Sequence, residues 1–121
     1  MNRRRLSTEE QREFAQRAFG RSSDRGIALP DGSFAWSRMQ CLDILRSLDT
    51  TKVAVEGGEF FRVEPIGLVP AYDGWTCERA PGETATDYAV RSRSVATSQI
   101  GMEAHADLLV VLELTDQDDA A

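Results

Sequence analysis

The apolar positions near the N-terminus of the chain follow a helical period. Residues Thr8–Phe19 carry a thin apolar face, and Ser7 with Glu10 matches the capping box that begins many helices. Gly20 is a natural stop for this helix. The pattern therefore predicts a short first helix, which must dock on the rest of the molecule to be stable.

Two longer helices are predicted further along the chain. Residues Ser33–Leu48 place five apolar side chains on one helical face, which we interpret as a core stripe: Phe34, Cys41, Ile44, Leu45 and Leu48. Trp36 and Met39 fall on the other side of this helix, where they either meet the first helix, which is the interpretation we favour, or form a small exposed patch. The third helix is predicted over Ala85–Ile100, with Thr84 as its N-cap.

Period-two patterns between these helices predict strands. Lys52–Glu56 and Glu59–Glu64 flank the pair Gly57-Gly58, which predicts a type I′ hairpin because that turn needs positive φ at both central residues. Leu68–Tyr72 predicts a short third strand. It should be irregular or lie at an edge of the sheet, because it contains Pro70.

The last pattern, over residues 108–114, is almost continuously apolar and predicts an interior strand. The order of elements predicts an α+β fold, with a small antiparallel or mixed β-sheet of about four strands packed against two or three helices. The length of 121 residues fits one domain over residues 1–121. We expect residues 1–6 and 116–121 to be disordered tails.

The charge of the chain limits its partners. Twenty Asp and Glu residues outnumber 14 Lys and Arg residues, for a net charge of −6. Nucleic acid is therefore a poor partner, because phosphate binding needs clustered cations, whereas a basic protein fits. No apolar run reaches the roughly 18 residues of a membrane-spanning helix, and no signal peptide is recognisable. We expect a cytoplasmic protein, with no membrane partner, in which Cys41 and Cys77 are reduced.

The residue types that catalysis requires are scarce. The chain has one histidine, His105, and its two cysteines lack metal-ligand spacing. Gly57-Gly58 is not followed by the helix N-terminus that a phosphate-binding loop needs. We therefore predict that the protein is not an enzyme and has no metal site and no cofactor.

Groups suited to recognition concentrate in the segment Tyr72–Arg79. In one interpretation Trp75 plugs the edge of the core and Asp73-Gly74 makes a turn. In the other, the aromatic and acidic groups form a contact patch, since Trp and Tyr are favoured interface anchors. The predicted Gly57-Gly58 hairpin would add an acidic tip. The candidate partner-binding residues are Glu56, Glu59, Tyr72, Asp73, Trp75 and Glu78.

Three segments together resemble a known family. They are Val53–Phe61, then Tyr72–Cys77, and then Gly82-Glu83-Thr84 followed by Tyr88–Ser92. In order and spacing, residues 40–100 are similar to the bacterial immunity protein 40 family of polymorphic toxin systems. The resemblance implies a cytosolic protein that binds its cognate toxin domain and blocks it without catalysis.

The residues alone leave a second function open. Apolar groups on both faces of the predicted hairpin also fit a non-catalytic small-molecule-binding or regulatory α+β module, a homo-oligomer formed through the sheet edge. A strictly monomeric protein without a deep apolar pocket would count against that interpretation.

Overall fold

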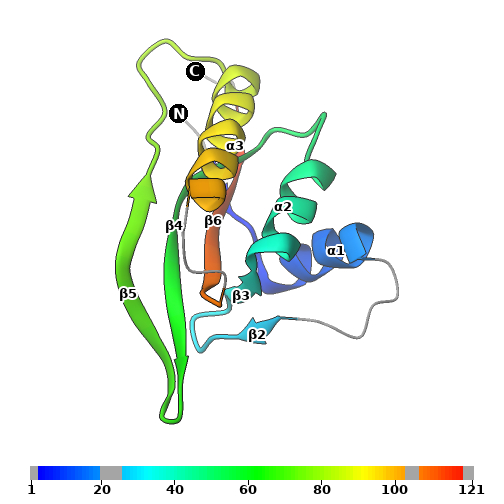
Figure 1. Ribbon diagram of the computed structural model, residues 1–121. Helices are drawn as coiled ribbons and strands as arrows, with labels where there is room; N and C mark the ends of the chain where they lie inside the picture. Colours follow the sequence, from blue (N-terminus) through cyan, green and yellow to red (C-terminus); the bar gives the residue numbers. More distant parts are fainter. Residues whose placement is uncertain (1–2, 20–25, 103–106, 119–121) are drawn as a thin grey trace.

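The computed structural model describes residues 3–19, 26–102 and 107–118, and it leaves the side chains of Phe19, Tyr72 and Asp73 outside the described part. The predicted α+β class is confirmed, because the described chain forms both helices and strands (Figure 1). The elements of the described residues are β1 (Arg3–Arg5), α1 (Thr8–Phe19), β2 (Ile27–Ala28), β3 (Phe34–Ser37), α2 (Arg38–Ser47), β4 (Val53–Glu64), β5 (Gly67–Thr76), α3 (Ala85–Met102) and β6 (Leu109–Gln117).

The described strands form one six-stranded sheet, larger than the four strands predicted. The strand order is β2-β3-β6-β4-β5, and every pair of neighbours is antiparallel. β1 also pairs with β6, beside Thr115–Gln117, whereas β3 pairs with Leu109–Val111. β6 therefore lies in the interior of the sheet, as its apolar sequence predicted, and β5 lies at one edge.

The first and third helices form where the sequence predicted them. The capping box of α1 is present, because the Glu10 N–H donates to Ser7 Oγ at 3.1 Å and the Ser7 N–H donates to the Glu10 side chain at 3.0 Å. α3 begins with the Asp87 N–H donating to Thr84 Oγ1 at 3.0 Å. His105 lies outside the described residues.

The predicted helix over Ser33–Leu48 begins too early. Phe34–Ser37 forms β3, and α2 starts only after Ser37, whose side chain accepts from the Gln40 N–H in a second capping box. Trp36 belongs to the strand and is buried, whereas Met39 lies in α2 and is 67% exposed, so the prediction that both lie on one side of a helix is wrong. The Ser-x-x-Gln spacing was a readable signal for this helix start.

Both ends of the described chain are more ordered than predicted. Arg3–Arg5 adds β1 to the sheet, and Leu6 is buried, with its N–H donating to the Leu114 carbonyl at 3.1 Å. Asp116 and Gln117 continue β6. The expectation of disordered tails is therefore wrong for residues 3–6 and 116–117.

α3 completes the hydrogen bonding of the sheet where β5 has ended. The Val55 N–H at the edge of β4 donates to Ser92 Oγ at 3.0 Å, and Arg93 donates to the Val53 and Thr51 carbonyls at 3.0 and 3.1 Å. Figure 1 shows α3 lying along this end of β4. Because buried backbone groups need partners, the polar side chains of α3 take the place of a further strand there.

Candidate functional site

The long antiparallel ribbon β4–β5 replaces the hairpin predicted at Gly57-Gly58. Both glycines lie within β4, neither has a positive φ, and the turn instead falls at Pro65-Ile66, between Glu64 and Gly67. Proline and glycine occupy the second and fourth positions of this turn, as type I turns favour. The prediction of an acidic hairpin tip is therefore wrong. The actual tip carries Ile66, which is 90% exposed, and the ribbon extends past the helices (Figure 1).

Gly58 provides the space for Trp75, its partner in β5. A β-carbon on Gly58 would lie 2.2 Å from Cη2 of the indole, so a larger residue cannot be accommodated without movement. Trp75 is half-buried, packs against the core and lies 5.8 Å from Phe60 between ring centroids. Its Nε1 is buried and has no hydrogen-bond partner among the described residues. The structure therefore supports the interpretation of Trp75 as a plug at the edge of the core.

Glu56 and Glu59 lie in one strand and serve different roles. Glu56 is the extra residue at an irregularity in the pairing of β4 with β6, and its half-buried side chain forms an ion pair with Arg3. Glu59 is exposed and lies beside Gly74 of β5 and Val111 of β6. Alternation along β4 places the Glu59 side chain on the face opposite to the buried Phe60. Glu59 is therefore the more exposed acid of this pair.

The interpretation of Asp73-Gly74 as a turn is also wrong. Tyr72, Asp73 and Gly74 continue β5, which ends at Thr76. The side chains of Tyr72 and Asp73 lie outside the described part, so of these two only the backbone is placed. Gly74 is needed at its position because a β-carbon there would lie 2.8 Å from the Gly58 carbonyl oxygen.

The loop that follows β5 is held by two arginines. Arg91 of α3 donates to both carboxylate oxygens of Glu83 at 2.7 and 2.8 Å, to the Glu78 carbonyl at 2.7 Å and to the Cys77 sulfur at 3.3 Å. Arg79 donates to the Glu83 carbonyl at 3.0 Å. Arg91, with the Ala80 N–H, lowers the pKa of Glu83 to about 2. These contacts fix a loop from which the Glu78 side chain is exposed.

Both cysteines are free and buried, so the described structure forms no disulfide between them. Cys41 lies in the core with its thiol directed at the Val110 carbonyl, and burial raises the pKa of this thiol. Cys77 belongs to the same small buried cluster as Tyr88, whose hydroxyl donates to the Cys77 carbonyl at 2.5 Å. In the described ranges, no group of three or more His, Cys, Asp or Glu side chains is arranged to hold a metal ion.

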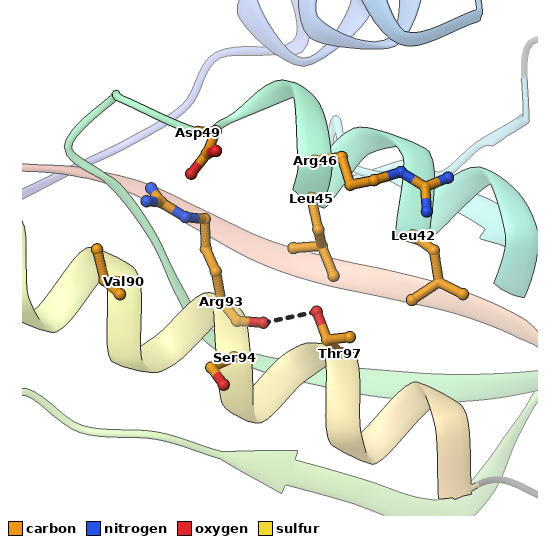
Figure 2. A pocket seen from close by; sticks show the side chains of 8 residues that line it. All are labelled: Leu42, Leu45, Arg46, Asp49, Val90, Arg93, Ser94 and Thr97. Carbon is orange, nitrogen blue, oxygen red and sulfur yellow. Dashed lines mark hydrogen bonds between the residues drawn. The ribbon is translucent and has the colours of Figure 1, made fainter.

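A shallow groove of about 400 Å³ runs between α2 and α3 (Figure 2). Its walls include Leu42, Leu45 and Val90, and Arg93 crosses it. Burial lowers the pKa of the Arg93 guanidinium, which donates to the carbonyls of Thr51 and Val53. The described residues lining the groove include neither a histidine nor a cysteine. The polar side chains that line it are those of Arg46, Asp49, Arg93, Ser94 and Thr97.

The edge position that Pro70 predicted for the third strand is confirmed, but the continuation of this strand to Thr76 was missed from the sequence. β5 is the last strand of the sheet, so one side of its backbone faces away from β4, and Gly74 and Thr76 are both exposed there. Among the described helices, none is long and apolar enough to cross a membrane.

Comparison with known proteins places this chain in a class and then in a family. The class is that of bacterial immunity proteins, because the family model described as Immunity protein 40 matches residues 23–113. The match covers most of the chain, which therefore belongs to the Immunity protein 40 family and has the general role of an immunity protein. No curated protein and no solved structure gives a significant match.

Proposed function

We propose that this protein neutralises a cognate bacterial toxin domain by binding it and covering the surface through which the toxin acts. The observation that carries the proposal is the membership of the Immunity protein 40 family, established over residues 23–113. In this mechanism the protein acts in the cytoplasm by occupancy alone and performs no chemistry on the toxin.

The acidic balance of the chain supports a basic toxin partner. The net charge is −6, and complementary charge speeds the encounter of two proteins and disfavours wrong partners. Glu59 and Glu78 are both exposed. Glu59 lies across the strand pair from Gly74 of β5, and Glu78 follows the end of β5 along the chain. Glu59 lies in a paired strand and the Glu78 carbonyl is held by Arg91, so the backbone of both is already ordered before a partner binds.

The proposed contact surface consists of the end of β5 and its acidic surroundings. It includes Glu59, Trp75 and Glu78, together with Tyr72 and Asp73 of the same strand. Glu56 contributes less than the exposed acids, because Arg3 already neutralises it. Trp75 contributes the edge of its half-buried ring, whose other side packs on Gly58.

Co-expression with the toxin domain encoded beside this gene tests the proposal directly. We expect cells to survive when both proteins are made, and the two proteins to co-purify. Survival without the immunity protein, or death despite its presence, would contradict the proposal.

A pair of charge-reversal variants then tests the surface. Glu59→Arg combined with Glu78→Arg should weaken toxin binding, whereas Glu9→Arg combined with Glu13→Arg makes the same change in charge on α1 and should weaken it far less. Equal effects of the two variants would show that only the net charge matters and that the contact surface lies elsewhere.

A further inference from the structure

We propose that the toxin is held by strand addition: an extended basic segment of the toxin pairs with the outer edge of β5 at Gly74–Thr76. This inference rests on the proposed function and specifies the surface and the backbone chemistry of the contact.

The direction of the free hydrogen-bonding groups follows from one contact. The Cys77 N–H donates to the Glu56 carbonyl at 2.8 Å, so residue 77 faces β4. Antiparallel pairing alternates, which directs the backbone of Trp75 toward Gly58 and the backbones of Gly74 and Thr76 away from the sheet. The same alternation directs Gly57 and Glu59 toward β6, in agreement with their pairing to Glu113 and Val111.

Other parts of this side of the sheet are already closed. Beyond the end of β5, Ser92 and Arg93 of α3 satisfy the edge of β4. Toward the ribbon tip, Pro70 pairs with Phe61, at a position whose backbone also points outward, and proline has no N–H to donate. In the described structure, Gly74–Thr76 is therefore the stretch of this edge that is nearest to the helices and still has backbone N–H and C=O groups directed away from β4.

The side chains around this stretch favour a strand from another protein. Exposed sheet edges are commonly protected by lysine, but β5 contains neither lysine nor arginine. Gly74 carries no side chain, so a neighbouring backbone can approach closely. Backbone pairing would supply affinity, and the side chains that alternate along the added strand would supply specificity.

Charge selects the occupant of this edge. Glu59 lies directly across from Gly74, and Glu78 follows Thr76 by two residues. A second copy of this chain would bring the same acidic groups to the contact, and like charges across paired strands are destabilising. A toxin strand bearing lysine or arginine instead forms favourable cross-strand pairs with these acids, so the edge fits a basic toxin better than a dimer.

Amide hydrogen exchange at single-residue resolution tests this on the unaltered protein, with and without the toxin domain encoded beside its gene. The amides of Gly74 and Thr76 should exchange quickly in the free protein and slow by about tenfold or more in the complex. The Trp75 amide, already directed at β4, is the internal control and should be slow in both states.

Proline substitution gives an independent readout. Thr76→Pro removes an outward N–H without removing a bond to β4, and it should weaken toxin binding by about tenfold. Thr76→Val keeps the backbone donor, and Leu68→Pro removes an outward donor near the ribbon tip, so both should bind like the unaltered chain. If Thr76→Pro does not fold, the exchange measurement on the unaltered protein decides the question.

The outcomes separate the two proposals. Toxin binding with no added protection at Gly74 and Thr76 would overturn strand addition and leave the proposed function standing. Failure of the unaltered chain to bind the toxin would overturn both proposals. Protection of the same two amides by self-association, with a dimer seen by light scattering, would assign the edge to a second copy and overturn the inference.

Discussion

The indole of Trp75 occupies the space in which a side chain on Gly58 would stand, with Cη2 at 2.2 Å from the position of a β-carbon there. The two residues face each other across β4 and β5, and the indole continues onto the ring of Phe60. The glycine is thus required by its neighbour in the sheet and not by a turn.

Gly58→Ala should therefore destabilise the fold. The added methyl group must displace a large, partly buried ring, and overpacking of this kind costs about 1–3 kcal/mol. Chemical denaturation would measure the loss in the free energy of unfolding. Gly101→Ala is the matched control, because nothing lies within 4 Å of a β-carbon on residue 101 of α3. In a helix this change should stabilise by about 0.5 kcal/mol, and equal effects at the two glycines would contradict the explanation.

Ser92→Ala tests the closure of the β4 edge by α3. The change leaves the buried Val55 N–H without its acceptor, and an unsatisfied buried group costs about 1–3 kcal/mol. Ser98→Ala on the exposed side of the same helix should change the free energy of unfolding by less than about 0.5 kcal/mol. Indistinguishable unfolding curves for the two variants would show that Ser92 has no special role.

The Arg91–Glu83 pair predicts a loss of stability in acid. The pKa of Glu83 is about 2 in the folded protein, below its ordinary value of 4.5, so its contribution is present above pH 4.5 and is lost as the pH falls through about 2. Glu83→Gln and Arg91→Met should each flatten the decline of unfolding free energy over this range. Part of the decline should remain, because Arg4 holds the pKa of Glu10 at about 2 as well. A slope unchanged in both variants would refute the assignment.

Tyr88 predicts a transition at the alkaline end. Burial raises its pKa to about 12, from an ordinary value of 10. The neutral hydroxyl, which donates to the Cys77 carbonyl, therefore contributes stability below pH 10, and this is lost as the pH rises through about 12. An ultraviolet absorbance titration should show a tyrosine step near pH 12 that disappears in Tyr88→Phe. Persistence of the step would assign it to another group.

Local signals were enough for the parts of the fold that are determined locally. The capping box of Ser7 and Glu10 fixed the start of α1, and Thr84 fixed the start of α3. The prediction of a hairpin at Gly57-Gly58 was wrong because two glycines suit either a turn or a strand that packs against a large ring. Trp75 decides between the turn and the strand. Because this residue is distant in sequence, the local pattern around the glycines could not predict the outcome.

The candidate site was predictable in composition but not in arrangement. The sequence left two interpretations of Trp75 open, and the structure supports the one that places it at the edge of the core; Glu78 is exposed in the loop after β5. The ion pair of Glu56 with Arg3 was not predicted, because it depends on β1, a three-residue strand of arginines that has no apolar pattern. Polar strands gain their stability from the sheet they join, and sequence periodicity carries no trace of that.

The interior position of β6 has a consequence for biosynthesis. β6 joins β1, β3 and β4, yet it is the last element of the described chain to leave the ribosome. Strands made much earlier must wait for it, and contacts between residues so far apart in sequence form slowly. During that interval the nascent sheet has unpaired edges, so the protein depends on completing its final strand before it meets either a partner or another unfinished copy of itself.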